Sequence, residues 1–266
     1  MSERPTPPPA EVIASDVARA LAEDVGSGDV TAALLPDSAD IAYLLCKEAA
    51  VVAGRPWFDA CHRAVDPDVR IEWRVQDGDH VPAGTVLATL SGRTRALVTA
   101  ERSSLNFLQT LSGTATVTAT YVDAVRGTGC TILDTRKTLP GLRLAQKYAV
   151  RCGGGQNHRI GLYDAVMLTE NHVRAAGSLV AAIRLARTAQ PSLPLIVEVE
   201  TLEQLDEALA AGCDRILIDD FDAGTRREAV RRAKAAPYLG RIPLEVSGSV
   251  DMTTLRGIAE DGVDCI

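Results

Sequence analysis

Basic side chains are concentrated in one short segment of an otherwise acidic sequence. Residues 136–159 contain seven Arg, Lys or His residues and no Asp or Glu, although the whole chain has a net charge of −7. Arginine binds carboxylates through paired hydrogen bonds, whereas lysine acts as a point charge that suits phosphate. The segment therefore predicts a site for a ligand with both groups. Its seven residues are Arg136, Lys137, Arg143, Lys147, Arg151, His158 and Arg159.

Three of the seven are predicted to have no binding role. Arg143, Lys147 and Arg151 are four residues apart on a helix predicted over 141–150, a spacing that is typical of a solvated helix face. Arg136 and Lys137 instead follow a predicted strand. His158 and Arg159 follow the glycines at 153–155, which allow the backbone to approach a ligand closely. We expect these four to bind the anion.

Carboxylates stand at the ends of two other predicted strands. A single acid there usually caps the next helix, but Glu198 and Asp219 together suit Mg²⁺, sugar hydroxyls or a developing positive charge. The turn at Ser247 and Gly248 also follows a strand. Its backbone N–H groups suit a terminal phosphate, although an ordinary turn between a strand and a helix has the same composition. Together these features predict a phosphoribosyl donor, an acidic acceptor and Mg²⁺.

The elements that position these residues fall into two parts. Strands predicted at 41–47, 51–53, 71–75 and 86–90, with a helix at 56–65, do not alternate regularly, which is typical of a small α+β domain. Predicted helices follow at 99–111 and 114–125. Apolar runs then alternate with helices, as in a barrel of parallel strands. These runs cover 131–134, 165–169, 195–198, 215–219, 244–247 and 263–266.

The second part is too short for a complete barrel. From residue 105 about 160 residues remain, below the ~200 that eight strand–helix units require. We therefore expect an α/β protein with an N-terminal α+β domain over 1–104 and an incomplete, open α/β barrel over 105–266.

Composition disfavours several classes of function. The net charge of −7 and an aromatic content of 4% disfavour a nucleic-acid or anionic-membrane surface. The six cysteines form no C-x-x-C pair, and no apolar run approaches the ~20 residues that span a bilayer. We expect a soluble, cytoplasmic protein with reduced thiols.

Several motifs resemble those of the quinolinate phosphoribosyltransferase family. The most specific are DTRKTLPG at Asp134–Gly141 and GGGQNHR at Gly153–Arg159. The likeness runs in order along nearly the whole chain. Its other parts are Glu23–Thr31, Ala100–Asn106, Glu198–Glu200, Ile218–Asp219 and Glu245–Gly248.

The resemblance implies a reaction and a fold. Members of this family transfer phosphoribosyl from phosphoribosyl pyrophosphate to quinolinate, releasing CO₂ and pyrophosphate and yielding nicotinate mononucleotide for NAD biosynthesis. The resemblance also implies Mg²⁺, a homodimer with shared active sites, and an N-terminal open sandwich joined to an incomplete barrel.

By position, the resemblance also implies residue roles. Lys137 would bind pyrophosphate, and Glu198 and Asp219 would face the ribose and its metal. The 5′-phosphate would lie at Ser247 and Gly248. The carboxylates of quinolinate would be held by Arg136, His158, Arg159 and the partner subunit's Arg102.

The sequence departs from the family pattern at a few positions. Thr169 stands where lysine is usual, and one lost hydrogen bond to a charged group, worth ~1.5–3 kcal/mol, would cost one to two decades of affinity or rate or change the accepted acid. Ile196 replaces a usual glutamate, and Asp220 a usual asparagine. The family also continues beyond residue 266 through a glycine-containing phosphate loop. We therefore expect either a truncated chain or an incomplete phosphate site.

Three alternatives remain open from the sequence. A paralogue could use the same donor with another pyridine or aromatic acid, which Thr169 would favour. A non-catalytic relic could bind phosphosugars, but Glu198 and Asp219 would weaken pure anion binding. Lys137 could instead form a Schiff base in aldol chemistry, with Arg136 lowering its pKa.

Overall fold

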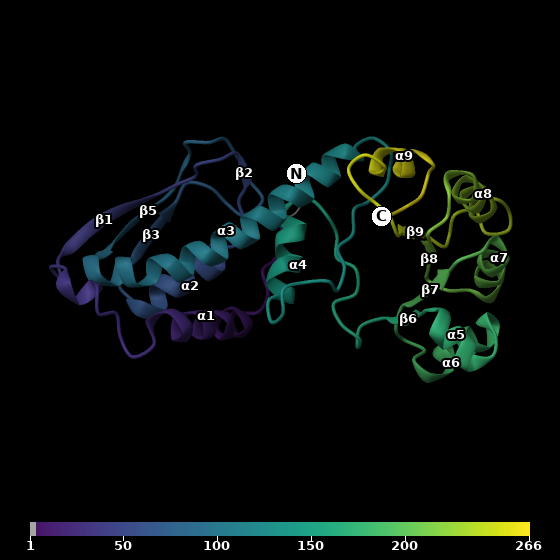
Figure 1. Cartoon of the computed structure of the whole chain (residues 1–266), viewed down its shortest axis with the longest axis horizontal. Coiled ribbons are helices and arrows are strands. Elements are labelled where there is room, and N and C mark those ends of the chain that lie inside the picture. Colours follow the sequence, from purple (N-terminus) through teal and green to yellow (C-terminus); the bar gives the residue numbers. More distant parts are fainter. Residues whose placement is uncertain (1–3) are drawn as a thin grey trace. The chain divides into compact units, whose positions relative to one another are not determined.

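The computed structural model describes residues 4–266, which form two compact units (Figure 1). Unit 1 comprises the chain up to Thr120 together with Lys137–Gly155, and unit 2 comprises Tyr121–Arg136 and Gln156–Ile266. The boundary expected between residues 104 and 105 falls inside α3 (Thr94–Ala124). Two helices were predicted in this region, but α3 is continuous through Gly113, because one glycine costs a helix only about 1 kcal/mol and α3 buries a long apolar face.

Unit 1 contains an antiparallel sheet with helices on one side (Figure 1). Its strand order is β1-β5-β3, and β2 pairs with β4 in a separate ribbon. Phe58, Leu90 and Leu108 pack in a core that joins helices to the sheet. The strands are β1 (Ala39–Leu45), β2 (Ala50–Val51), β3 (Arg70–Trp73), β4 (His80–Val81) and β5 (Val86–Arg93). The other helices of this part are α1 (Ala10–Val25), the 3₁₀ helix η1 (Ala32–Leu34) and α2 (Arg55–Val65).

Helix α4 (Arg143–Cys152) packs into the core of unit 1. Tyr148 donates its hydroxyl hydrogen to the buried Asp77 carboxylate at 2.7 Å. A Cβ at Gly153 would lie 2.3 Å from the carbonyl oxygen of Ala115, so only glycine fits where α4 ends. The prediction of a solvated basic face is wrong for Lys147, which is 2% exposed. The spacing of basic residues along one helix could not reveal this burial, because burial depends on residues that pack against the helix from elsewhere in the chain.

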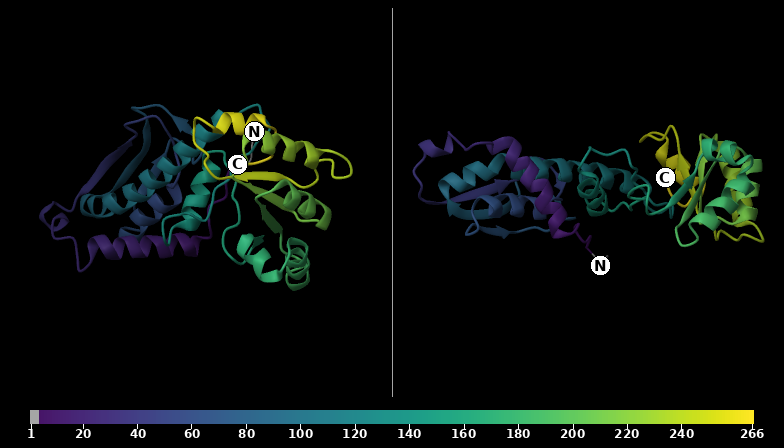
Figure 2. Two further views of the ribbon diagram at one scale, coloured as in Figure 1. Left: turned by 45° about the vertical axis from the view of Figure 1, so that its right-hand side comes forward. Right: turned by 90° about the horizontal axis from the view of Figure 1, so that it is seen from below.

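Unit 2 is built on a parallel sheet in the order β6-β7-β8-β9. Helices alternate with its strands, and the views in Figures 1 and 2 place α5–α8 along one side of the sheet. The strands are β6 (Val166–Leu168), β7 (Leu195–Val199), β8 (Arg215–Asp219) and β9 (Leu244–Ser247). The helices are α5 (Glu170–Ala176), α6 (Leu179–Ala189), α7 (Leu202–Ala211), α8 (Ala223–Lys234) and α9 (Leu255–Glu260).

Local sequence signals explain the limits of these helices. Ser178, Thr201 and Asp222 each accept a hydrogen bond from the backbone N–H three residues later, at the start of α6, α7 and α8. Gly212 ends α7 with φ of +79°, a left-handed conformation that glycine adopts without strain. The strand–helix alternation predicted from these signals is confirmed.

Two expected strands are reduced to isolated pairings. Residues 131–134 and 263–266 contribute parallel bridges, Thr131 with Cys265 and Cys265 with Glu245, rather than continuous ladders. Leu133 likewise bridges Gln156 in parallel. These segments continue the sheet beyond β9 without long strands, because each offers only a few extended residues. The predicted class, an N-terminal α+β domain followed by a parallel α/β part, is confirmed, and the structure shows that the N-terminal sheet is antiparallel.

Among the described residues, none of the helices combines the length and the apolar character that a membrane span requires.

A buried histidine makes the stability of unit 1 depend on pH. His62 is 4% exposed against the Phe58 ring, and burial lowers its pKa to about 4. An unfolded histidine titrates near ~6.5, so between pH 4 and 6.5 the unfolded chain binds more protons and stability falls as pH falls, by up to about 3 kcal/mol. Chemical unfolding across this range should show that loss in the parent and not in His62→Gln. An equal loss in both proteins would contradict the assignment.

Candidate active site

The strands of unit 2 present different chemistry on their two faces. One face is apolar and packs against the helices through residues such as Val197, Ile218 and Val246. Side chains alternate along a strand, so the intervening residues lie on the other face. Ile196 and Leu217 form a small cluster there with Ala165. The polar residues of this second face are Glu198, Arg215, Asp219, Glu245 and Ser247.

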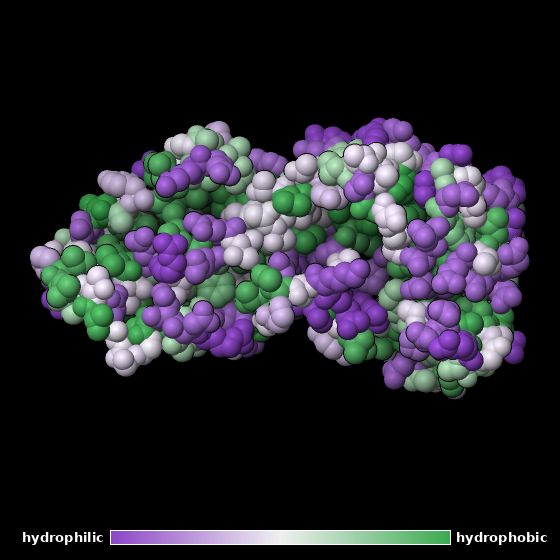
Figure 3. All heavy atoms as spheres, viewed as in Figure 1, coloured by the Kyte–Doolittle hydropathy of each residue, from purple (hydrophilic) through white to green (hydrophobic). Residues whose placement is uncertain are grey.

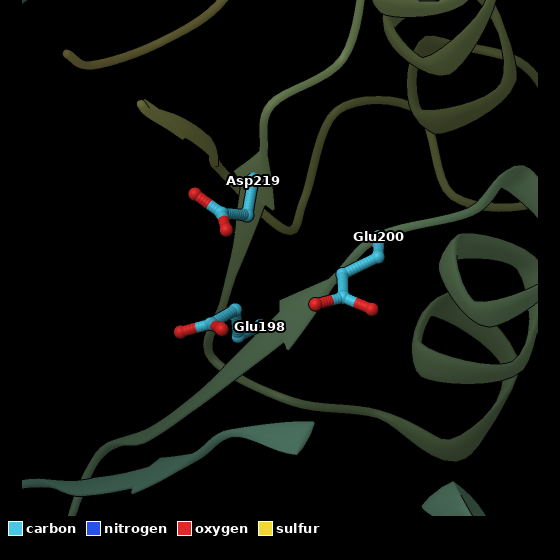
Figure 4. A group of neighbouring side chains, drawn as sticks. All are labelled: Glu198, Glu200 and Asp219. Atoms are coloured by element: carbon cyan, nitrogen blue, oxygen red, sulfur yellow. The ribbon is translucent and has the colours of Figure 1, made fainter. Parts of the chain in front are cut away.

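Three carboxylates gather at the carboxyl ends of β7 and β8. Oxygen atoms of Glu198, Glu200 and Asp219 all lie within 4.8 Å of one another (Figure 4). Burial, with Asp219 and Glu200 as negative neighbours, raises the pKa of Glu198. Carboxylates held this close repel unless a cation compensates them, and such oxygen ligands suit a hard divalent ion. Glu200 was missing from the predicted metal ligands, although its spacing of two from Glu198 was a signal that both lie on one face.

The predicted phosphate turn adjoins this acidic cluster. Ser247 donates its hydroxyl hydrogen to Asp219 Oδ1 at 2.9 Å, as the register between β8 and β9 allows. Gly248 has φ of +85°, and a Cβ there would meet Asp219 Oδ1 at 3.4 Å. The flanking Asp220 and Ser249 are also left-handed, with φ of 55° and 49°. This conformation brings the backbone of the turn close to Asp219.

Two of the predicted cationic residues lie within electrostatic reach of each other. Arg136 and Arg159 are both partly buried. Burial, and then the charge of Arg136, lower the pKa of Arg159. Two guanidinium groups held against their mutual repulsion form a site that an anion stabilises.

The bridges of unit 2 show how Arg136 reaches the same edge of the sheet as the acids. Thr131 and Glu245 both pair with Cys265 in parallel. Segment 131–134 therefore leaves the sheet at the end where the carboxyl termini of β7, β8 and β9 lie, and Arg136 follows directly. The structure thus brings Arg136, Glu198 and Asp219 to one edge of unit 2.

His158 faces a carboxylate of the protein itself. Its side chain is 8% exposed, and its Nε2 lies 3.3 Å from Oε2 of Glu245. Arg215 Nη1 donates to the same oxygen at 3.1 Å. His158 Nδ1 accepts the backbone N–H of Arg159 at 2.8 Å. Neither Glu245 nor Arg215 was among the predicted site residues, and a direct contact between His158 and the acid substrate stays a prediction.

Thr169 lies directly after β6 and begins α5 as its N-cap. Its backbone N–H donates to Nδ1 of His172 at 3.2 Å, which is one half of a reciprocal cap between the two residues. Its hydroxyl also lies 2.9 Å from the same nitrogen. Because Leu168 pairs with Val197, Thr169 leaves the sheet beside Glu198.

Thr169→Lys is expected to give unchanged or higher turnover with quinolinate. A lysine at this edge adds a positive charge toward an anionic substrate, which lowers KM by up to about tenfold. Loss of the N-cap costs about 1 kcal/mol, so the melting temperature should fall slightly. Steady-state kinetics and thermal unfolding of both proteins check this. A clear fall in turnover by a folded variant would contradict the prediction.

Lys137 and Arg102 belong to unit 1. Lys137 is exposed and begins the segment that carries α4. Arg102 is exposed on α3 and lines a cleft of about 1070 Å³ between α3 and the sheet. Hydrophobic residues are visible over this part of unit 1 (Figure 3, left). Large apolar side chains that line the cleft and remain exposed are Ile41, Tyr43, Leu45, Val98 and Val117.

Family comparisons account for both parts of the chain. The N-terminal domain of quinolinate phosphoribosyl transferase matches residues 29–112, and the C-terminal domain of the same family matches residues 114–266. The chain belongs to the quinolinate phosphoribosyltransferase family. The resemblance found in the sequence is therefore confirmed.

Relatives within the quinolinate phosphoribosyltransferase family match this chain over most of their length. The carboxylating nicotinate-nucleotide pyrophosphorylase of Mycobacterium leprae is 44% identical over 257 residues, covering 93% of this chain and 88% of the relative. The chloroplastic carboxylating nicotinate-nucleotide pyrophosphorylase of Arabidopsis thaliana is 40% identical, and the match covers 100% of this chain and 81% of the relative. The solved structure of the Francisella tularensis nicotinate-nucleotide pyrophosphorylase superposes with a TM-score of 0.94 at 40% identity. The superposition covers 100% of this chain and 93% of that structure.

Proposed function

We infer that this chain is a decarboxylating quinolinate phosphoribosyltransferase. It joins quinolinate to the phosphoribosyl group of phosphoribosyl pyrophosphate and releases pyrophosphate and CO₂, leaving nicotinate mononucleotide. The observation that carries this inference is the identity of about 40% to carboxylating nicotinate-nucleotide pyrophosphorylases over nearly the full chain. The arrangement of charge in unit 2 supports it, because positive and negative groups meet at one sheet edge.

The acceptor is a dianion, and the paired arginines suit it. Arg136 and Arg159 would bind the two carboxylates of quinolinate, each through a pair of N–H groups. Burial and then the charge of Arg136 lower the pKa of Arg159, and the repulsion between the two guanidinium groups would be relieved when the dianion binds. This relief favours a doubly charged acid over nicotinate, which carries one carboxylate.

The donor would be bound across the acidic cluster. Breaking the bond between C1 of the ribose and pyrophosphate leaves positive charge on the sugar, which Glu198 and Asp219 would stabilise. Lys137 would compensate the negative charge that develops on pyrophosphate. The backbone of Ser247 and Gly248 would hold the 5′-phosphate.

The carboxylates of the cluster fit Mg²⁺. Their oxygen atoms are close together and partly buried, and hard divalent cations prefer such ligands. Glu198 and Asp219, with Glu200 added by the structure, would hold the ion. When bound, Mg²⁺ supplies positive charge that neutralises the pyrophosphate oxygens.

Decarboxylation follows from the chemistry of the product ring. Once the ring nitrogen bonds to C1 of the ribose it carries a positive charge. The electron pair left by departing CO₂ is then stabilised beside this cationic nitrogen, and the carbon takes a proton from solvent. No side chain needs to act as a general base, which fits a site built from arginines and carboxylates.

A second copy of the chain is the proposed occupant of the cleft in unit 1. Five large apolar side chains are exposed there, more than an isolated surface usually gathers in one place. Arg102 at this cleft would reach the partner's active site, as the family resemblance implies. Sedimentation of the purified protein should show a dimer, and a stable monomer that is fully active would contradict shared active sites.

One assay tests the proposed function. Purified protein with Mg²⁺, quinolinate and phosphoribosyl pyrophosphate should release CO₂ and pyrophosphate in equal amounts. Parallel reactions with nicotinate and other aromatic acids test whether Thr169 has changed the accepted acid. Release of pyrophosphate without CO₂ from another acid would identify a paralogue, and no release with any acid would point to a binding relic.

A further inference from the structure

Asp134 joins two segments that carry predicted substrate-binding residues. It lies two residues before Arg136. Its Oδ1 accepts the backbone N–H of His158 at 2.8 Å, and its Oδ2 accepts a hydrogen from the Asn157 side chain at 2.6 Å. Its own backbone N–H donates to the carbonyl oxygen of Gln156 at 3.1 Å. Segment 156–158 is thus fixed to the start of the segment that carries Arg136.

Two other carboxylates also hold residues close to this connection. Asp164 accepts the backbone N–H groups of Ile160 and Gly161 at 2.8 and 2.9 Å. Glu245 faces the ring of His158. Asp164 thus fixes the loop that follows Arg159, and Glu245 contacts the residue that precedes it. Asp134 accepts hydrogen bonds from Asn157 and His158 and lies two residues before Arg136, so it ties the Arg159 side of the site to the Arg136 side.

The connection opposes an electrostatic cost. Arg136 and Arg159 lie close enough for the charge of one to lower the pKa of the other. In the absence of an anion, this repulsion favours separation of the two segments. A preformed site binds its ligand more tightly because the cost of bringing its groups together has already been met.

We propose that Asp134 is a positioning residue that locks the Asn157–His158 backbone to the 134–136 segment and so preforms the arginine pair for a dicarboxylate acid. This inference rests on the proposed function. It gives Asp134 a role that acts through Asn157 and the His158 backbone, and it assigns Asn157 the role of its partner.

A reciprocal exchange of the two side chains tests the proposal. In Asp134→Asn, an amide NH₂ replaces Oδ2 and faces the NH₂ of Asn157. In Asn157→Asp, two carboxylates face each other. The double variant D134N/N157D reverses donor and acceptor, and Oδ1 at position 134 can still accept the His158 N–H. Both hydrogen bonds, the one between side chains 134 and 157 and the one from the His158 N–H, are therefore available together only in the parent and the double variant.

Each single variant is expected to raise KM for quinolinate about tenfold or more, with kcat and KM for phosphoribosyl pyrophosphate changed less than about threefold. The double variant should recover most of the lost affinity. Amide hydrogen exchange at His158 should be faster in both single variants and slow again in the double variant. An equal rise in both KM values, or a double variant no better than the worse single variant, would overturn the proposal.

Asp214→Asn is the matched control. Asp214 Oδ2 also accepts a backbone N–H, that of Leu195 at 2.6 Å, but at the opposite edge of the sheet where β7 begins. This variant should lose stability and keep both KM values. If the parent does not turn over quinolinate, the proposed function fails. The exchange rates at His158 still test the lock itself in that event.

Discussion

Asp219→Asn is expected to lower kcat about a hundredfold or more, because the neutral amide no longer stabilises positive charge on the ribose in the transition state. Asparagine has the same size, and its Oδ1 can still accept the hydroxyl hydrogen of Ser247. KM for quinolinate should stay within about threefold, since the arginines that bind the acid are unchanged. Steady-state kinetics at saturating phosphoribosyl pyrophosphate measure both effects.

Mixing two inactive variants shows whether Asp219→Asn has lost activity at its active site or has failed to fold. If active sites are shared in a homodimer, Arg102→Ala and Asp219→Asn damage sites through different subunits. Heterodimers formed after mixing should contain one intact site and regain part of the parent turnover. A folded Asp219→Asn variant with parental kcat would show that Asp219 does not stabilise the transition state.

Lys137→Ala is expected to abolish nearly all turnover, by roughly a thousandfold, because the leaving pyrophosphate loses a positive charge at the step where its negative charge develops. Lys137 is exposed, so its loss should leave the unfolding temperature almost unchanged. Pyrophosphate release measured in a single turnover tests the chemical step directly.

Lys147→Ala is the informative comparison for Lys137→Ala. Lys147 belongs to the same basic segment but is buried in α4, so its replacement should lower the unfolding temperature more than it lowers turnover. Parental turnover in Lys137→Ala would show that the leaving group is stabilised by other residues.

Much of the fold follows from patterns that a few neighbouring residues determine. Thr201 accepts the N–H of Gln204 at the start of α7, and Gly212 ends that helix, as the sequence indicated. The alternation of apolar runs with helices identified β6, β7, β8 and β9. These signals are local, because a cap or a strand face depends on residues two to four positions apart.

The site residues could be named from the sequence only where their positions matched a motif. Strand-end positions and the family motifs together indicated Arg136, Glu198 and Asp219. The addition of Glu200 to the acidic cluster depended on the register of β7 against β8. The pairing of Glu245 with His158 and Arg215 depended on three distant segments.

The sequence by itself determined the family, the order of helices and strands, and the charged residues available for catalysis. The tertiary structure alone decided which of these charges face each other. It buried Lys147, directed the Ser247 hydroxyl to Asp219, and locked Asn157 and His158 to Asp134. The physical reason is that caps and strand alternation are set by near neighbours in the chain. Burial and charge pairing are set by the residues that packing brings together from distant positions.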